Sequence, residues 1–456
     1  MSGTYSIVGL GKLGASMAAA IASRGCNVVG VDISREAVRA VNEGRAPVQE
    51  TGLAELIAAN RERLRATDSH RDAVHASDVT FVIVPTPSDE SGAFSLQYAA
   101  WAFGEIGAAL ADKTGYHLVV LTSTVLPGAT RHGLLPILER RSGKRAGIDF
   151  GLCYSPEFIA LGSVIRDFLN PDFTLVGELD DRSGRALEAA YAEIMPNRPS
   201  CRRMTLENAE LTKISLNAYV TTKIAYANML ADLCERIPGG DVDVVSDALG
   251  LDARIGRKYL TGALGYGGPC FPRDNVALGF LARALDTRAE LPETTDRVNR
   301  SLAGTILDRV GVPIAHGTTV AVLGLAYKPA SHVIEESQGL FLAKALSRRG
   351  ARVVAHDPLA GSMAAHELKD QGLVLQSVAD CLRQASVVVI TTPDPVYRAL
   401  GPADFTAGGR PVTVVDCWRI LASSLENRPG ITYVPIGRSV DEDKNTKRLA
   451  ALWANP

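Results

Sequence analysis

The sequence predicts an α/β protein in which two regions of alternating strands and helices flank a helical middle region. Short β-branched runs alternate with helical patterns in the first part of the chain, as they do again from Thr319 onward. Between these regions, residues 205–235 contain neither proline nor glycine and carry apolar residues at helical spacing. We expect two layered sheets and one long helix between them.

The first α/β region opens with a strand pattern at residues 5–8, the glycine turn GLGKLG at 9–14 and an alanine-rich helical pattern. In such a turn, Gly9 allows the tight bend, Gly11 lets a pyrophosphate approach, and Gly14 lets the helix pack on the strand. We expect Leu13 to contribute to the same cofactor site.

A second strand pattern, residues 27–31, ends in Asp32. A carboxylate about 20 residues beyond the glycine turn would accept hydrogen bonds from the adenosine ribose hydroxyls and would repel a 2′-phosphate. The arrangement predicts a Rossmann-like domain that binds NAD rather than NADP. The alternative is a doubly wound domain with an incidental glycine turn.

Polar and proline residues follow three further strand patterns. Pro85 and Thr86 follow the run at 81–84, Thr124 follows the run at 118–121, and Glu157 follows the run at 151–154. Parallel sheets place their ligands at the carboxyl ends of strands. We therefore expect these residues to lie near the cofactor, although Glu157 could equally be an ordinary surface acid.

The long middle helix would span about 45 Å at 1.5 Å per residue. That is longer than one globular half needs, so we expect the helix to link two domains and to pack against a copy of itself. Lys213 and Asn217 lie four residues apart on one face of this helix. Taken alone, both would more often be solvated polar residues.

Cys270 lies in the segment GYGGPCFPRD at residues 265–274. An isolated cysteine is usually a small buried apolar residue. Here glycines allow close backbone approach to a ligand, and Arg273 and Asp274 follow within one turn. This pattern, together with a dinucleotide site, favours a nucleophile. The seven cysteines include no CxxC pair, which fits neither a disulfide framework nor a zinc site, so we expect no metal.

The second α/β region contains strand patterns at 319–323, 352–356, 387–390 and 412–416. We expect three domains: an NAD-binding domain over residues 1–200, a helical domain over 201–310 and a nucleotide-binding Rossmann-like domain over 311–456. Two such α/β halves could hold a dinucleotide and a second nucleotide.

Composition favours a large cytoplasmic enzyme. The 456 residues carry a formal net charge of −2, and the positive charges are scattered, so the chain has no basic footprint for nucleic acid. No apolar run approaches the length of a membrane span, and the N-terminus enters a strand without a signal-like region. We expect neither a nucleic-acid nor a membrane partner.

The chain resembles the UDP-glucose/GDP-mannose dehydrogenase family over essentially its whole length. The matching segments are GLGKLG at 9–14, STV at 123–125, SPEF at 155–158, Lys213 with Asn217, the Cys270 segment, and GLAYKP at 324–329. The resemblance implies a two-step, four-electron oxidation of a sugar C6 alcohol to a carboxylate, with two NAD+ consumed and a cysteine thioester as intermediate.

The resemblance also implies roles for the catalytic residues. Cys270 would be the nucleophile, and Lys213 would stabilise oxyanion charge with Asn217 as a neutral donor beside it. Asp274 and Thr124 match residues that hold a catalytic water, and Glu157 matches a carboxylate that assists proton removal.

The substrate residues follow from the same resemblance. Those expected to contact the nucleotide sugar are Phe158, Leu161, Lys213, Asn217, Tyr259, Gly267, Lys328 and Arg419. Arg254 matches an arginine that reaches the neighbouring subunit's sugar pocket, so we expect a homodimer.

Two departures from the family pattern affect the choice of sugar. Leu161 stands where the family usually has an acid near the sugar, and Pro269 stands where serine is common before the cysteine. UDP-glucose is the expected substrate, and an N-acetylated or otherwise modified UDP-hexose is the alternative.

Two other classes of protein are alternatives. A 3-hydroxy acid dehydrogenase, which transfers one hydride, would not need Cys270 or a second nucleotide-sized domain. A non-catalytic NAD sensor would not need Cys270, Lys213 and Asp274 together, and all three are present.

Overall fold

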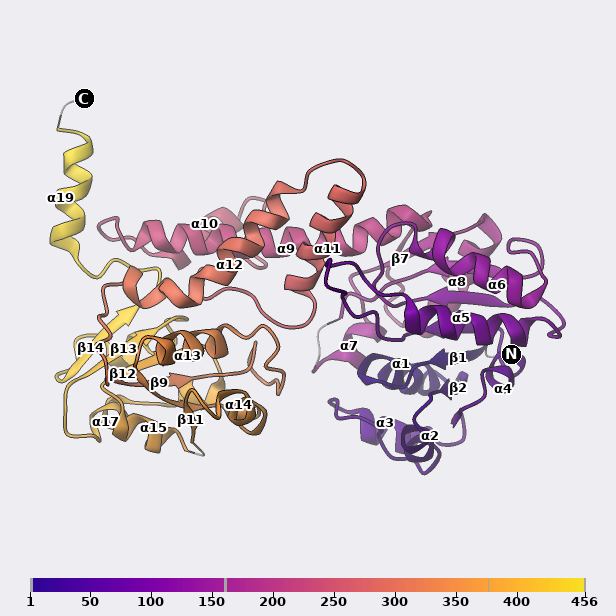
Figure 1. Cartoon of the computed structure of the whole chain (residues 1–456), viewed down its shortest axis with the longest axis horizontal. Coiled ribbons are helices and arrows are strands. Elements are labelled where there is room, and N and C mark those ends of the chain that lie inside the picture. Colours follow the sequence, from indigo (N-terminus) through magenta and orange to yellow (C-terminus); the bar gives the residue numbers. More distant parts are fainter. Residues whose placement is uncertain (1–2, 160–161, 376, 455–456) are drawn as a thin grey trace. The chain divides into compact units, whose positions relative to one another are not determined.

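The computed structural model describes residues 3–159, 162–375 and 377–454, and the chain forms two compact units, residues 1–216 and 217–456. Each unit contains one α/β sheet, and helices occupy the part of the sequence between the two sheets (Figure 1). The predicted fold class, two Rossmann-like sheets separated by a helical central region, is confirmed.

The first unit is built on an eight-stranded sheet. Neighbouring strands are parallel except for β6 and β7, which pair antiparallel. In sheet order the strands are β3 (Leu64–Thr67), β2 (Asn27–Val31), β1 (Thr4–Val8), β4 (Val79–Val82), β5 (Leu118–Leu121), β6 (Gly151–Tyr154), β7 (Phe173–Glu178) and β8 (Ser200–Thr205). The strand order reverses beside β1, so its carboxyl end opens at the point where such sheets bind ligands.

Helices cover both faces of this sheet. Ile7 and Phe81 belong to one apolar core, whereas Val8 and Val82 belong to the other, because successive side chains of a strand point to opposite faces. The helical elements are α1 (Lys12–Ser23), α2 (Arg35–Asn42), α3 (Leu53–Ala59), α4 (His70–His75), α5 (Gln97–Leu110), the π-helix η1 (Ala129–Leu134), α6 (Leu135–Ser142), α7 (Val164–Leu169) and α8 (Asp181–Ile194).

The long helix α9 runs over Leu206–Cys234, within one residue of the predicted range at each end. It begins in the first unit, and its later turns belong to the second. Among the described residues, no helix is long and apolar enough to cross a membrane.

The second unit contains a six-stranded parallel sheet and the remaining helices. The strands in sheet order are β11 (Leu373–Val374), β10 (Arg352–His356), β9 (Thr319–Leu323), β12 (Val387–Ile390), β13 (Val412–Asp416) and β14 (Ile431–Pro435). The helices are α10 (Val242–Gly250), α11 (Phe271–Ala284), α12 (Glu290–Arg309), α13 (Gln338–Arg348), α14 (Gly361–Leu368), α15 (Val378–Gln384), α16 (Pro395–Arg398), α17 (Pro402–Thr406), α18 (Ala422–Leu425) and α19 (Glu442–Leu452).

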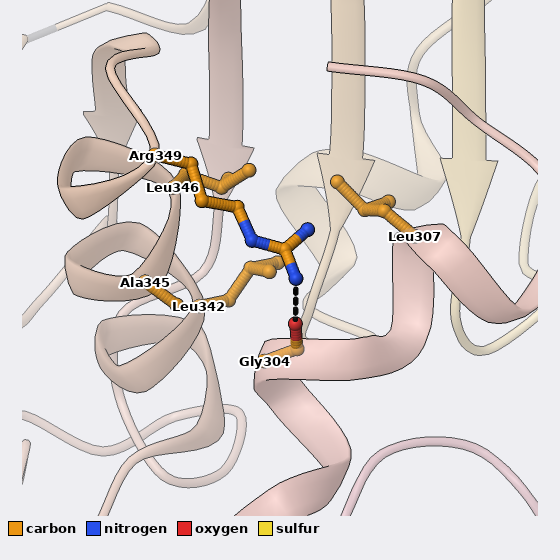
Figure 2. Close-up of a pocket in the computed structure, with 6 residues that line it drawn as sticks. All are labelled: Gly304, Leu307, Leu342, Ala345, Leu346 and Arg349. Carbon is orange, nitrogen blue, oxygen red and sulfur yellow. Dashed lines mark hydrogen bonds between the residues drawn. The ribbon is translucent and has the colours of Figure 1, made fainter.

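Helix α12 packs directly on α13, the first helix of the second sheet (Figure 2). Leu307 from α12 meets Leu342 and Leu346 from α13 in the apolar core of this unit. Arg349 closes one end of the contact by donating to the Gly304 carbonyl at 3.1 Å and by pairing with Asp308 at 2.6 Å. The helical segment and the second sheet therefore share one core in this unit.

Candidate active site

The glycine turn after β1 has the geometry that each of its glycines was expected to provide. Gly9 has φ of +99°, and a Cβ on it would lie 2.2 Å from the Ile83 carbonyl oxygen. A Cβ on Gly14 would lie 1.9 Å from the Gly9 carbonyl oxygen, so neither position accepts a side chain. A Cβ on Gly11 would meet nothing within 4 Å, which leaves the backbone open to a ligand at the start of α1.

Asp32 lies beside this turn because β2 pairs with β1 along its whole length. Its Oδ2 accepts a hydrogen bond from the Leu10 amide at 2.7 Å, and its Oδ1 accepts one from the Ser34 amide at 2.7 Å. Leu13 is partly buried against the core beneath α1. The backbone cradle and the neighbouring carboxylate fit a dinucleotide whose pyrophosphate contacts the turn and whose ribose contacts Asp32.

The loops after β4 and β5 are joined to each other. Thr86 Oγ1 donates to the Thr124 carbonyl at 2.7 Å. Ser123 Oγ donates to the Val84 carbonyl at 2.6 Å and accepts from the Val84 amide at 2.9 Å. The structure therefore brings Thr86 and Thr124 together. Pro85, which directly precedes Thr86, is exposed.

Lys213, Glu157 and Phe158 form a cluster in the first unit. Lys213 is buried, and its Nζ donates to the Glu157 carbonyl at 2.7 Å. The same nitrogen lies 4.7 Å from the centroid of the Phe158 ring. Burial raises the pKa of the Glu157 carboxyl to about 7, although the positive charge of Lys213 acts in the opposite direction. This carboxyl can therefore exchange a proton near neutral pH.

Sequence reasoning missed Glu210, which lies three residues before Lys213 on α9. Its buried carboxyl accepts from the Gly128 amide at 2.6 Å and from the Thr130 amide at 2.9 Å. Desolvation raises the pKa of this carboxyl. Glu210 thus ties the loop that follows Thr124 to α9. The sequence does contain a sign of this role, because Glu210 lies on the same helix face as Lys213 and Asn217.

Asn217 and Asp274 meet in the second unit. Asn217 Nδ2 donates to Asp274 Oδ2 at 2.6 Å, and only 1% of the Asp274 surface is exposed. Asn217 lies one turn beyond Lys213 on α9, and Asp274 lies in the first turn of α11.

Cys270 is the residue that precedes the first turn of α11, and it is exposed. Its carbonyl accepts from the Asp274 amide at 2.9 Å, which places Asp274 one turn further along the helix. Pro272 in the first turn costs no hydrogen bond, since the first helical amides have no partner within the helix. Because the N-terminal end of a helix stabilises negative charge, this location suits a thiolate nucleophile.

The residues expected at the nucleotide sugar fall into different settings. Tyr259 has φ of +68° and is half exposed, with its ring centroid 6.4 Å from that of Phe271. Lys328 Nζ lies 5.6 Å from the centroid of the Tyr327 ring. Arg254 is largely exposed and pairs with Asp252 two residues earlier. Leu161 lies outside the described residues.

Arg419 is buried and uses its guanidinium within the chain. Nε and NH2 bond the two carboxylate oxygens of Asp243 at 2.7 and 2.8 Å. NH1 donates to the carbonyls of Gly262 at 2.8 Å and Ile436 at 2.6 Å. Arg419 therefore connects the loop after β13 with α10 and with the segment that leads to Cys270. Among the described residues, no cluster of three histidine, cysteine or acidic side chains could hold a metal ion.

A mostly parallel sheet whose strand order reverses beside this glycine turn, with a carboxylate at the end of the neighbouring strand, is typical of the NAD-binding α/β domains of dehydrogenases. The chain belongs to the UDP-glucose/GDP-mannose dehydrogenase family. The family's NAD-binding domain matches residues 4–195 of this chain, the family's central domain matches residues 207–301, and the family's UDP-binding domain matches residues 321–423. The protein is therefore an NAD-dependent nucleotide-sugar 6-dehydrogenase.

Two curated relatives and one solved structure resemble the chain along most of its length. The UDP-glucose 6-dehydrogenase AglM of Haloferax volcanii is 36% identical, with 94% of this chain and 98% of that protein covered. The GDP-mannose 6-dehydrogenase of Azotobacter vinelandii is 35% identical, with coverage of 90% and 96%. The structure of a UDP-glucose dehydrogenase from Pyrobaculum islandicum is 32% identical with a TM-score of 0.85, covering 96% and 98%.

Proposed function

We propose that this enzyme oxidises the C6 alcohol of UDP-glucose to the carboxylate of UDP-glucuronate in two steps, with Cys270 holding the intermediate. The observation that carries the proposal is the exposed Cys270 at the start of α11, one turn before the buried Asp274–Asn217 pair. A single oxidation of an alcohol to an aldehyde needs no nucleophile, whereas oxidation to the acid does.

NAD+, when bound, accepts the hydride in each of the two oxidations. The first oxidation removes a hydride from C6 and the proton of its hydroxyl, which leaves an aldehyde. The Cys270 sulfur adds to the aldehyde carbon, and the carbonyl oxygen takes up the thiol proton to become the hydroxyl of a thiohemiacetal. Loss of a second hydride and of the hydroxyl proton leaves a thioester. Water then attacks the thioester carbon, the carbon–sulfur bond breaks, and the acid leaves with the Cys270 thiol restored. In this scheme the cofactor is held by Gly9, Gly11, Gly14 and Asp32, with Leu13, Pro85, Thr86 and Thr124 beside it.

The remaining site residues take defined roles in this scheme. Lys213 stabilises oxyanion charge as a preorganised cation, and Asn217 donates a neutral hydrogen bond. Asp274 and Thr124 hold the attacking water, and the Glu157 carboxylate accepts its proton. Glu157 suits this role because its carboxyl has a pKa of about 7.

The nucleotide sugar is proposed to contact Phe158, Leu161, Tyr259, Gly267, Lys328 and Arg419. The corresponding division of labour is residues 1–200 for NAD, 201–310 for catalysis and subunit contact, and 311–456 for the nucleotide. UDP-glucose is supported by the names of the Haloferax and Pyrobaculum proteins and by the UDP-binding domain. GDP-mannose is the competing substrate, because the Azotobacter relative is nearly as similar.

The proposal also includes a homodimer in which α9 packs against its copy and Arg254 reaches the neighbouring sugar site. An apolar stripe on the later turns of α9 supports this arrangement: Tyr219, Tyr226, Met229 and Leu233 are between 48% and 64% exposed. The large exposure of Arg254 is compatible with a contact outside its own chain.

The test of this function is the number of NADH molecules formed per sugar consumed. UDP-glucose, GDP-mannose, UDP-N-acetylglucosamine, UDP-N-acetylmannosamine and UDP-galactose are each supplied to the purified enzyme with NAD+. We expect two NADH per sugar and the highest kcat/KM with UDP-glucose. A ratio of one, or a preference for another sugar, contradicts the respective part of the proposal.

The Cys270→Ser variant tests the covalent step separately. We expect overall turnover to fall by at least about a thousandfold, because a serine hydroxyl is a far weaker nucleophile at neutral pH. Product analysis by mass spectrometry distinguishes the acid from a released aldehyde. Full formation of the acid by Cys270→Ser would exclude the thioester.

A further inference from the structure

The peptide segment that leads to Cys270 is held by buried side-chain amides. Asn299 on α12 bonds both backbone polar groups of Tyr266: its Oδ1 accepts from the Tyr266 amide at 2.8 Å, and its Nδ2 donates to the Tyr266 carbonyl at 2.9 Å. Gln338, the first residue of α13, donates to the same carbonyl at 3.0 Å. Asn299 is 4% exposed and Gln338 is 5% exposed. Helices α12 and α13 therefore both bond the backbone of Tyr266, which lies four positions before the proposed nucleophile.

Residues 263 and 264 are held by another buried side-chain amide, that of Asn228 on α9. Asn228 Oδ1 accepts from the Ala263 amide at 2.8 Å, and Asn228 Nδ2 donates to the Leu264 carbonyl at 3.3 Å. A Cβ on Gly265 would lie 2.1 Å from Asn299 Oδ1. The absence of a side chain at Gly265 is thus what lets the Asn299 amide reach the backbone.

The following glycines rest on the loop between β9 and α13. The Gly268 amide donates to the Glu335 carbonyl at 3.0 Å. A Cβ on Gly267 would lie 2.4 Å from the Glu336 carbonyl oxygen, and one on Gly268 would lie 2.7 Å from the Tyr327 ring. This loop also carries Lys328. The second α/β half therefore supports the segment directly.

The Tyr266 side chain also bonds the residue that follows Asp274 on α11. Its hydroxyl accepts from Asn275 Nδ2 at 3.0 Å, and Asn275 directly follows Asp274 on α11. Asn275 Nδ2 donates in addition to Thr221 Oγ1 at 2.9 Å. Tyr266 is thus bonded by the side-chain amides of Asn299 and Gln338 through its backbone and by Asn275 of α11 through its hydroxyl.

We propose that Asn299 and Gln338 are positioning residues for Cys270, acting through the Tyr266 peptide that both of them bond. This proposal rests on the proposed function, in which Cys270 is the nucleophile. Thiol addition needs a near-attack geometry, and a displacement of about 1 Å can cost on the order of a hundredfold in rate. The second α/β half then contributes to the chemical step through Gln338.

The chain offers a matched control for the loss of such an amide clamp. Asn42 on α2 bonds both polar groups of Ala66: its Oδ1 accepts from the Ala66 amide at 2.8 Å, and its Nδ2 donates to the Ala66 carbonyl at 2.9 Å. Asn42→Ala removes two hydrogen bonds of the same kind as Asn299→Ala, but in the first unit, and neither Asn42 nor Ala66 is assigned to the reaction.

The experiment compares Asn299→Ala, Gln338→Met and Asn42→Ala in the full chain. Three quantities are measured: kcat and KM with the nucleotide sugar, the melting temperature, and the rate at which iodoacetamide alkylates Cys270. Peptide mass spectrometry separates Cys270 from the other six cysteines. Gln338→Met keeps the length of the side chain and removes its donor, so it serves if Asn299→Ala does not fold.

We expect Asn299→Ala and Gln338→Met to lower kcat by about tenfold or more, to leave KM within about threefold, and to change the alkylation rate of Cys270. Asn42→Ala is expected to leave kcat and the alkylation rate unchanged. Asn299→Asp keeps the acceptor for the Tyr266 amide and should recover part of kcat.

The positioning role is overturned if the variants at Asn299 and Gln338 lower only the melting temperature and otherwise match Asn42→Ala. The alkylation rate needs neither substrate nor turnover. It therefore tests the geometry at Cys270 even if Cys270→Ser shows that the proposed thioester is wrong, so the two failures are distinguishable.

Discussion

Glu157 illustrates how the surroundings of one residue adjust its chemistry. Its carboxyl lies beyond the end of β6, and burial raises its pKa to about 7 against the opposing charge of Lys213 on α9. The Tyr191 hydroxyl on α8 also lies within electrostatic range, and burial raises the pKa of that phenol far enough to keep it neutral. A general base must be deprotonated, so the proposed hydrolysis uses the carboxylate form that predominates above pH 7.

We accordingly predict that kcat rises with pH through about 7 and falls by about tenfold per unit below it. The measurement is kcat at saturating sugar and NAD+ between pH 5.5 and 9. Glu157→Gln should lower kcat and flatten this limb, because the amide cannot accept a proton. A Glu157→Gln variant that retains the limb near pH 7 would assign the titration to another group.

At the scale of elements, α9 combines two faces with different purposes. Its buried polar side chains bond the chain itself: Glu210 holds the loop after β5, and Asn228 holds the segment before Cys270. The stripe of Tyr219, Tyr226, Met229 and Leu233 is exposed and apolar. Contiguous exposed apolar surface of this kind marks interaction sites in most proteins that carry it.

The dimer proposal therefore predicts that Met229→Glu weakens self-association. A carboxylate placed at the centre of an apolar contact would have to be desolvated without a partner, which costs several kcal/mol. Sedimentation velocity over a range of concentrations measures the effect. Ile148→Glu puts the same charge on an exposed isoleucine of the first unit and serves as the control. A monomeric wild-type protein would contradict the dimer.

At the scale of the whole molecule, the two sheets repeat one plan with different outcomes. Gly324 has φ of +112°, and a Cβ on Gly339 would lie 2.1 Å from the Gly324 carbonyl oxygen. Gly14 has the same close contact with the Gly9 carbonyl oxygen in the first sheet. Asp357 bonds the Leu325 amide at 2.8 Å, as Asp32 bonds Leu10. The second turn differs because a longer loop, which carries Lys328, separates Gly324 from α13.

The carboxylate of Asp357 is also more fully occupied than that of Asp32. It accepts from the amides of Leu325 and Ala326 through Oδ2, and from those of Leu359 and Ala360 through Oδ1. Asp357 is buried, whereas Asp32 is partly exposed. These differences favour a dinucleotide in the first half and a different nucleotide in the second.

This division predicts the effect of Asp32→Ala. Loss of a charged hydrogen-bond acceptor costs about 1.5–3 kcal/mol, so NAD+ affinity should fall by roughly ten- to a hundredfold. Binding of UDP, measured by calorimetry on the same variant, should not change. Asp32→Asn, which keeps an oxygen acceptor for the Leu10 amide, should reduce the preference for NAD+ over NADP+. Unchanged NAD+ affinity in both variants would refute the ribose assignment.

Local patterns allowed much of the fold to be predicted. The glycine turn, the long α9 and most of the strands at the centre of both sheets follow from short-range signals: φ-permissive glycines, helical spacing and β-branched runs. The edge strand β8 was missed because Ser200–Thr205 includes Arg202 and Arg203 and has no buried residue to produce an apolar pattern. The antiparallel pairing of β6 with β7 was missed for a different reason. The direction in which two strands pair depends on the connection between them rather than on their own residues.

The sequence by itself determined the fold class and the family, and it supplied the proposed reacting groups, because those depend on residue types at short spacing. Only the tertiary structure decided which groups support them. Asn299 and Gln338 meet at Tyr266, and Arg419 meets Asp243, across long stretches of chain. A buried polar side chain must find its partner wherever the fold places one, and no local pattern records where that is.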